Sequence, residues 1–193
     1  KRVKKLINTT PDFIEMLNLI DHAQKSKCKF IFIEASSIGY KEGRLGNLKY
    51  NLCFLTNLKS DHLDYHKTLR NYHFSKIEMI KKHYGKNSKI LIQDYKLLSK
   101  LKTLGKTIHD QNNFIKNYNF KTEIKNDGRV GIMVHKNKFK INIINDFVLK
   151  NTISIFHIYH SLLKKFPTIL NKSIYPKGRS DIVFNKDNKI ILI

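Results

Sequence analysis

The stretch NLCFLTNLKSDHLDYH, Asn51–His66, joins a short apolar run to the densest cluster of polar side chains in the chain. Its first half, Asn51–Leu58, predicts a buried strand because it is apolar and short. Its second half, Thr56–His66, carries hydroxyl, amide, carboxylate and imidazole groups. Ligands of open α/β sheets bind at the carboxyl ends of the strands. The stretch therefore predicts a ligand site directly after a buried strand.

Strand-like and helix-like segments alternate on both sides of this stretch. The motif Thr9-Thr10-Pro11-Asp12 predicts a helix start with a threonine cap, and apolar residues then recur at helical spacing from Phe13 to Ile20. Further buried strands are predicted at Lys29–Glu34 and Ser88–Gln93, and further helices at Leu69–Tyr84 and Tyr95–Leu101. This alternation predicts the α/β class, with a mostly parallel sheet flanked by helices and a P-loop-like architecture.

The pattern changes after about residue 120. Turn signals at Asn126-Asp127-Gly128 and His135–Lys138 divide Lys121–Ile144 into β-like runs, which predicts a small antiparallel β meander. A helix is predicted over Phe147–Phe166, before Pro167. Two more strands are predicted at Asp181–Phe184 and Lys189–Ile193.

The composition favours a globular cytoplasmic protein. The 193 residues are 41% hydrophobic, which is enough for a sizeable core. No apolar run reaches the roughly 18 to 20 residues that span a bilayer, and the basic start of the chain is not followed by a secretory signal. Cys28 and Cys53 lie far apart beside apolar runs, so we expect buried thiols rather than a disulfide.

The net charge of +22 raises the possibility of nucleic-acid binding. Only five of the 37 cationic side chains are arginines, whereas nucleic-acid readers rely on arginine for bidentate contacts. The lysines are spread along the whole chain, together with abundant asparagine and isoleucine, as a compositional bias would produce. We therefore keep a basic nucleic-acid-binding domain as the less favoured alternative, and expect a polyanionic small substrate.

A second polar group, Glu34-Ala35-Ser36-Ser37, also follows a predicted strand, so the two groups can converge on one crevice. Oxygen ligands with an occasional imidazole suit a hard cation such as Mg²⁺. The i, i+4 pair His62 and His66 is not a zinc-protease motif, because Leu63 stands where the glutamate is required. Taken alone, a histidine such as His62 is more often a hydrogen-bonded side chain than a ligand. Likewise, a lysine such as Lys76 on a lysine-rich helix is more often a solvated charge than a functional group.

One apparent nucleotide motif fails. Gly105-Lys106-Thr107 resembles the end of a phosphate-binding loop, but the motif G-x-x-x-x-G-K-[ST] needs a glycine where Lys100 stands. No other match to this motif occurs in the 193 residues.

Taken together, the motifs resemble those of the Mur ligase family over nearly the whole chain. They are Thr9-Thr10-Pro11, Glu34-Ala35-Ser36-Ser37, Arg44, Thr56–His66 and Ser75-Lys76, in the family's order. The long match TNLxxDHLDYH is the most specific, and it points to the family member that adds the third amino acid of the peptidoglycan stem peptide. The resemblance implies the central, ATP-binding domain of a ligase that activates the carboxylate of UDP-N-acetylmuramoyl-L-Ala-D-Glu as an acyl phosphate.

The resemblance also implies roles for single residues. Lys76, as a carbamate, and His62 would lie at the catalytic centre and bind Mg²⁺ together with Glu34. The UDP-sugar dipeptide would be held by Thr9, Thr10, Ser36 and Arg44. The nucleotide of ATP would be contacted by Asn151 and Arg179.

The sequence departs from the family pattern at four positions. Ile38 replaces a histidine, Glu42 stands where glutamine is common, Lys67 replaces the glycine after DYH, and Val148 replaces the first asparagine of F-N-x-x-N. The family's P-loop and C-terminal domain are not recognised within residues 1–193. We therefore expect an incomplete central domain, a fragment or a non-catalytic relic, that is monomeric and does not catalyse ligation alone.

Overall fold

The computed structural model describes residues 6–93, 98–101, 108–124, 130–134, 137–141, 146–167, 182–186 and 189–192. The chain forms two compact units. Unit 1 comprises residues 1–53, 57–90 and 99–108, and unit 2 comprises residues 54–56, 91–98 and 109–193. Each unit is described by itself.

The first helix, α1 (Phe13–Lys25), begins where the sequence predicts but with a different cap. The side chain of Asp12 accepts a hydrogen bond from the backbone N–H of Glu15 at 2.9 Å, so Asp12 is the N-cap. The predicted threonine cap is therefore wrong. Thr10 is buried and its hydroxyl is used elsewhere.

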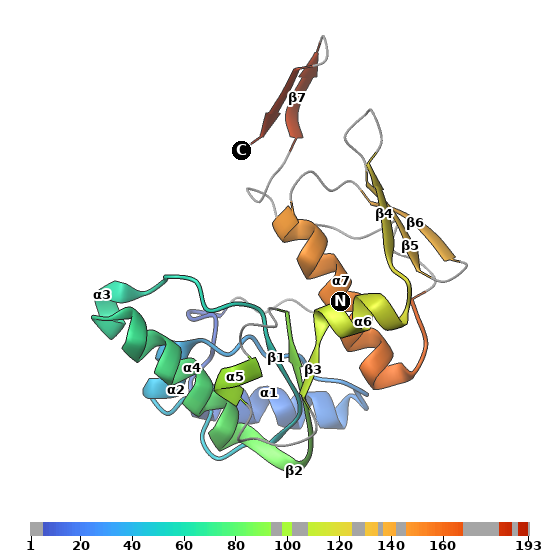
Figure 1. Cartoon of the computed structure of the whole chain (residues 1–193). Helices are drawn as coiled ribbons and strands as arrows, with labels where there is room; N and C mark the ends of the chain where they lie inside the picture. The colour runs from blue at the N-terminus through green and yellow to red at the C-terminus, as the bar shows by residue number, and fades with distance from the viewer. Residues whose placement is uncertain are drawn as a thin grey trace. The chain divides into compact units, whose positions relative to one another are not determined.

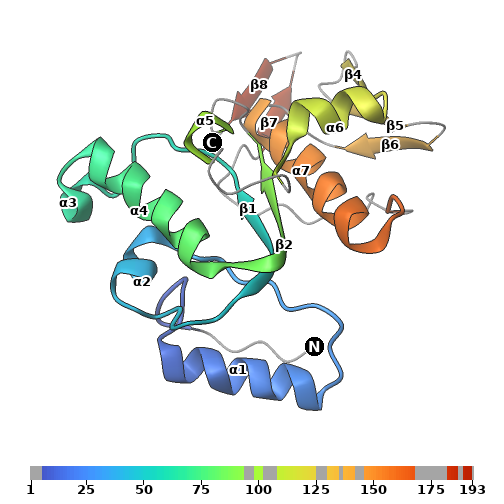
Figure 2. The same ribbon diagram turned by 60° about the horizontal axis from the view of Figure 1, so that its bottom comes forward.

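A three-stranded sheet has the order β1 (Tyr50–Leu55), β2 (Tyr84–Ile92) and β3 (Ile108–Asp110). Ser88 Oγ donates to the Tyr50 carbonyl at 2.5 Å, and the Gln93 N–H donates to the Leu55 carbonyl at 3.0 Å. These contacts follow the same order along both strands, so β1 and β2 are parallel, as predicted. Figure 2 shows the two strands side by side. The end of β2 is fully buried.

The expected strand at Lys29–Glu34 is absent. This segment belongs to none of the sheets that the described residues form, and Phe32 is 74% exposed. An apolar run becomes a strand only where a neighbouring backbone pairs with it and its faces are covered, and neither condition is met here. Cys28 is exposed rather than buried, and Cys53 is half-buried; both are free thiols.

Three helices of unit 1 carry the motifs. They are α2 (Ser37–Lys41), α3 (Leu63–His66) and α4 (Leu69–His83). Figure 1 shows α2 and α3 beside the long α4, which they both contact. Thr68 caps α4 by accepting a hydrogen bond from the Asn71 N–H at 3.1 Å. A short helix, α5 (Leu98–Leu101), falls within the predicted Tyr95–Leu101.

The predicted meander forms in unit 2. The strands β4 (Lys121–Ile124), β5 (Val130–Val134) and β6 (Asn137–Ile141) pair antiparallel in that order. The meander packs with α6 (Gln111–Asn117) and α7 (Asp146–Leu163) around a core made of Phe114, Ile132, Val134, Phe139, Ile153 and Phe156. The two strands predicted near the end of the chain form as β7 (Ile182–Lys186) and β8 (Lys189–Leu192). They pair antiparallel.

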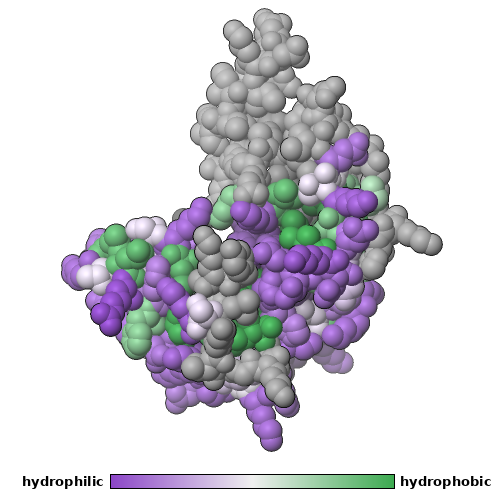
Figure 3. All heavy atoms as spheres, viewed as in Figure 1, coloured by the Kyte–Doolittle hydropathy of each residue, from purple (hydrophilic) through white to green (hydrophobic). Residues whose placement is uncertain are grey.

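Hydrophilic residues cover much of the face drawn in Figure 3, and apolar residues appear in separate patches. Among the described residues, no helix has both the length and the apolar character that crossing a membrane requires.

A buried histidine makes the stability of unit 2 depend on pH. His157 is 5% exposed, its ring stacks on Phe114 with the centroids 4.2 Å apart, and its Nδ1 has no hydrogen-bond partner among the described residues. Burial lowers the pKa of His157 to about 4. As pH falls, the unfolded chain therefore binds a proton at His157 before the folded chain does. The neutral His157 thus contributes to the free energy of unfolding, and the contribution is complete above pH 6.5, the pKa in the unfolded chain. It is lost as pH falls from 6.5 to about 4.

We expect this contribution to be on the order of 3 kcal/mol, because the pKa falls from 6.5 to about 4 and a difference of one in pKa corresponds to about 1.4 kcal/mol. Urea unfolding at several pH values between 7.5 and 4 should show a shallower pH dependence in His157→Gln than in the wild type. The exposed His22 provides the matched control, His22→Gln, which should keep the wild-type slope. Equal slopes in all three proteins would contradict the prediction.

Candidate functional site

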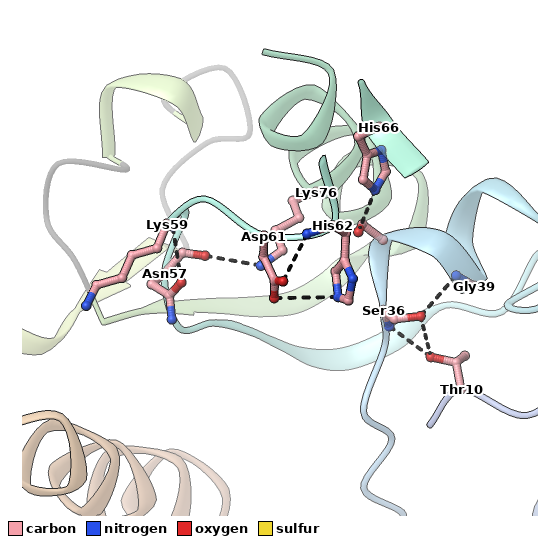
Figure 4. Close-up of polar contacts among 10 residues, drawn as sticks. Thr10, Ser36, Gly39, Asn57, Lys59, Asp61, His62, His66 and Lys76 are labelled. Carbon is pink, nitrogen blue, oxygen red and sulfur yellow. Dashed lines mark hydrogen bonds and ion pairs between the residues drawn. The ribbon is translucent and has the colours of Figure 1, made fainter. Parts of the chain in front are cut away.

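The hydroxyl of Thr10 joins the two segments that the sequence assigns to substrate binding. Thr10 Oγ1 donates to the Glu34 carbonyl at 2.9 Å and accepts from the Ser36 N–H at 2.8 Å. Ser36 Oγ lies 3.1 Å from the same hydroxyl and accepts from the Gly39 N–H at 3.0 Å, which caps α2 (Figure 4). A Cβ on Gly39 would lie 2.9 Å from Thr10 Cβ, so only glycine allows this approach. Thr9 is exposed.

Arg44 belongs to the same network. Its Nη1 donates to the Thr10 carbonyl at 3.0 Å, and its Nη2 forms an ion pair with the carboxylate of Glu42. Three of the predicted substrate residues, Thr10, Ser36 and Arg44, therefore lie together. Glu42, one of the departures from the family pattern, thus already pairs with the guanidinium group of Arg44.

The second half of the site is arranged around the ring of Tyr72, which is 2% exposed. The His62 and Tyr72 ring centroids are 6.4 Å apart, and Lys76 Nζ lies 4.7 Å from the Tyr72 centroid, within cation–π range. Lys76 Nζ also donates to the Asn57 carbonyl at 3.3 Å. The predicted catalytic pair, His62 and Lys76, therefore lies beside one aromatic ring. Figure 4 shows both side chains, with the contact from Lys76 to Asn57.

The loop before α3 fixes His62 through its neighbour Asp61. The backbone N–H of His62 donates to Asp61 Oδ1 at 2.9 Å, and His62 Nε2 lies 3.5 Å from Asp61 Oδ2. His62 itself has a left-handed backbone, with φ of 51°. Its side chain is 44% exposed and thus open to a ligand.

A buried contact joins the two halves. Ser37 Oγ lies 2.9 Å from His66 Nε2, with Ser37 1% and His66 6% exposed, and the His66 ring centroid is 5.4 Å from that of Tyr72. Burial lowers the pKa of His66, and the nearby His62 and Lys41 lower it further, so its imidazole is neutral near pH 7. The segment that begins at Glu34 and the segment that follows β1 are therefore in contact, and their role as one ligand site stays a prediction.

Sequence reasoning missed the residues that make this connection. Ser37 and His66 lie 29 residues apart in the chain, and no local pattern pairs them. The i, i+4 spacing of His62 and His66 was the available signal, but it indicates a shared helix face and not a serine partner. Tyr72 is a normal core position of an amphipathic helix by its spacing.

The three predicted metal ligands, Glu34, His62 and Lys76, can be compared with the needs of Mg²⁺. Among the described residues no group of three or more His, Cys, Asp or Glu side chains is arranged to hold a metal ion. Glu34 is exposed and supplies a carboxylate, His62 supplies an imidazole, and Lys76 donates to a carbonyl oxygen. A hard cation prefers oxygen ligands. The set therefore fits Mg²⁺ only when Lys76 carries a carbamate, and the metal roles of the three residues stay predictions.

The predicted nucleotide residues belong to the second half of the chain. Asn151 lies on α7 in unit 2, and its Oδ1 accepts a hydrogen bond from Gln93 Nε2 at 3.0 Å. Val148, which replaces a family asparagine, packs against the hydrophobic core of this unit. Arg179 lies outside the described residues.

Lys67 occupies a strained turn between α3 and α4. Its φ is 65° and its ψ is −37°, and the Thr68 N–H donates to the His66 carbonyl at 2.8 Å across it. This is a γ-turn, which is strained for a residue with a Cβ. The geometry explains why a glycine at this position suits the motif.

We expect Lys67→Gly to stabilise unit 1 by roughly 0.5–1 kcal/mol, because relief of strain exceeds the entropy cost of a glycine. Urea unfolding of the two proteins measures the difference. Lys81→Gly, on the exposed face of α4, is the matched control and should lose about 1 kcal/mol. A loss of stability in Lys67→Gly would show that the turn is unstrained.

Comparison with known proteins identifies the family. The sequence profile of the family described as "Mur ligase middle domain" matches residues 1–158. Three similar curated proteins are all named UDP-N-acetylmuramoyl-L-alanyl-D-glutamate–2,6-diaminopimelate ligase. The one from Fusobacterium nucleatum is 28% identical over 169 residues, covering 81% of this chain and 33% of the relative. The one from Phocaeicola vulgatus is 30% identical over 176 residues, covering 84% and 34%. The one from Wolinella succinogenes is 44% identical over 64 residues, covering 33% and 15%.

The chain thus spans about a third of the length of the longer-matching relatives. The matched region contains every site residue described in unit 1, and Asn151 in unit 2. The chain belongs to the Mur ligase family, to whose middle domain residues 1–158 correspond.

Proposed function

We propose that this chain is the central part of an ATP-dependent ligase that adds the third amino acid to UDP-N-acetylmuramoyl-L-Ala-D-Glu in peptidoglycan precursor synthesis. The membership of the family and the names of the relatives support the reaction class. The observation that carries the proposal is the contact chain from the Thr10, Ser36 and Arg44 network through Ser37 and His66 to His62 and Lys76. This chain of contacts supports the proposal that the substrate-binding and catalytic candidates belong to one site.

In the proposed reaction, ATP phosphorylates the terminal carboxylate of the dipeptide, and the amine of the incoming amino acid displaces phosphate from the acyl phosphate. Thr10, Ser36 and Arg44 would bind and orient the UDP-linked substrate. Glu34, His62 and the carbamate of Lys76 would hold Mg²⁺, which when bound neutralises crowded phosphate oxygens. In its unmodified form, the Lys76 ammonium contacts the Tyr72 ring and the Asn57 carbonyl, which supports a position of this side chain close to His62.

The proposal assigns residues 1–193 to an incomplete central domain. In the Mur ligase family a phosphate-binding loop holds the phosphates of ATP, and no match to the motif G-x-x-x-x-G-K-[ST] occurs in residues 1–193. The incoming amino acid, diaminopimelate or lysine, would bind to the C-terminal domain of the family. We propose a monomeric cytoplasmic enzyme with no nucleic-acid partner.

The second candidate is a non-catalytic relic that keeps the fold and part of the substrate site. The ion pair between Glu42 and Arg44 favours this alternative, because it places a carboxylate where an anionic substrate would be held. Ile38 also lacks the hydrogen-bonding capacity of the family's histidine.

A ligation assay on the complete polypeptide that contains this chain separates the candidates. We expect phosphate release only when UDP-N-acetylmuramoyl-L-Ala-D-Glu, ATP and either diaminopimelate or lysine are all present, with a product of the corresponding mass. UDP-N-acetylmuramoyl-L-Ala is the matched control substrate and should give none. Substrate binding without turnover would identify the relic, and absence of both would refute the two candidates together.

A further inference from the structure

A network of buried amide and hydroxyl groups surrounds Asn151 in unit 2. Gln93 Nε2 donates to Asn151 Oδ1 at 3.0 Å and to Ser154 Oγ at 3.3 Å. We propose that Gln93 is a positioning residue that fixes the side-chain amide of Asn151, so that Asn151 Nδ2 donates to the base of the bound nucleotide. This inference rests on the proposed function, in which Asn151 contacts the nucleotide.

The direction of these hydrogen bonds follows from Ser154. Its hydroxyl is 2% exposed, and its single proton is donated to the Lys150 carbonyl at 2.9 Å. Ser154 Oγ must therefore act as an acceptor towards its other neighbours. Gln93 has to present its Nε2 group to Ser154, and the same group reaches the oxygen of Asn151.

Two further contacts hold the network rigid. Gln111, which is 3% exposed, donates from Nε2 to the Lys150 carbonyl at 2.8 Å and to Ser154 Oγ at 3.1 Å. The backbone N–H of Gln93 donates to the Leu55 carbonyl at 3.0 Å, which ties Gln93 to the end of β1. Gln93 is thus fixed from both its backbone and its side chain, as a positioning residue requires.

The hydrogen bond from Gln93 determines which end of the Asn151 side-chain amide, the donor or the acceptor, is available to a ligand. A side-chain amide offers an acceptor oxygen and a donor nitrogen, and rotation by 180° exchanges them. With Oδ1 engaged by Gln93, the Nδ2 end faces the ligand and requires an acceptor. A purine ring nitrogen or a 6-oxygen meets this requirement, whereas the 6-amino group of adenine does not. The contact therefore accepts ATP through a ring nitrogen and does not discriminate against inosine triphosphate.

Calorimetric titration of the complete polypeptide with ATP and with inosine triphosphate tests the polarity. Gln93→Glu replaces the donor with acceptor oxygens, so the Asn151 amide should turn and present Oδ1 to the base. We expect the affinity for inosine triphosphate to fall about tenfold relative to that for ATP, because Asn151 Oδ1 can then accept a hydrogen bond from the 6-amino group of adenine but would face an acceptor, the 6-oxygen, in inosine triphosphate. Gln93→Met, which removes the contact without reversing it, should weaken both nucleotides by a similar factor.

Gln111→Met is the matched control, because Gln111 belongs to the same network but does not contact Asn151. It should lower thermal stability and leave the ratio of the two affinities unchanged. If Gln93→Glu behaves like Gln111→Met while Asn151→Ala weakens ATP binding, the positioning role is wrong and the proposed function stands. If Asn151→Ala leaves ATP affinity unchanged, or the polypeptide binds no ATP, the nucleotide assignment of the proposed function is wrong and the inference falls with it.

Discussion

Replacing Lys76 with alanine in the complete polypeptide is expected to reduce ligation by about a thousandfold or more, because a metal ligand in phosphoryl transfer contributes several kcal/mol of charge stabilisation. Lys76 extends from α4 over Tyr72 towards the Asn57 carbonyl, beside His62. As a carbamate, Lys76 would supply an anionic oxygen ligand for Mg²⁺ in addition to the ligands from Glu34 and His62. Phosphate release with all substrates present measures the loss.

Three comparisons make this prediction specific. Lys76→Arg keeps the positive charge but cannot form the carbamate, so it should be as inactive as Lys76→Ala. Acetate or propionate, which mimic the carbamate, should restore part of the activity of Lys76→Ala but not that of Lys76→Arg. Lys81→Ala, on the exposed face of the same helix, is the matched control and should retain activity. Wild-type turnover in Lys76→Ala would show that Lys76 is not part of the catalytic centre.

The largest stability effect is expected at Phe156. Its side chain is fully buried, and its ring meets Phe139 and Phe120 edge to face with centroids 5.0 and 5.6 Å away. Phe156→Ala should destabilise unit 2 by about 3–5 kcal/mol, because it removes apolar contacts and leaves a cavity between α7 and the meander. The shift of the urea-unfolding midpoint at constant slope measures this change.

The neighbouring Ile155 provides the control for Phe156. Ile155 is 49% exposed on the same helix, so Ile155→Ala should cost less than about 1 kcal/mol. The helix propensity of alanine is the same in both variants, and the difference between them isolates burial. Similar losses in the two proteins would show that the core of unit 2 lies elsewhere.

Local sequence signals predicted those elements whose cause is local. The helix predicted at Leu69–Tyr84 is α4, Leu69–His83, because apolar spacing and the Thr68 cap both lie within the segment. The meander was found because its turns have their own residue signature. The strand predicted at Lys29–Glu34 failed because a strand also depends on a partner backbone, which an apolar run cannot specify.

The same distinction applies to the site. The motif placed His62 and Lys76 together, because the loop and the helix that carry them are consecutive in the chain. The pairing of Ser37 with His66 and of Gln93 with Asn151 joins residues 29 and 58 positions apart. Such contacts arise from packing of whole elements, and a single sequence does not encode them in any short pattern.

The exposed segment KFIFIE, Lys29–Glu34, governs how this chain behaves when it is concentrated. Its four consecutive bulky apolar side chains, on a backbone that belongs to none of the sheets formed by the described residues, are a template for intermolecular strand pairing. Charges normally oppose such pairing, but here the two ends carry opposite signs. In an antiparallel pair, Lys29 of one copy would meet Glu34 of another, so the flanking charges attract instead of repelling. Self-association through this segment would increase with protein concentration and would weaken as salt screens the charges.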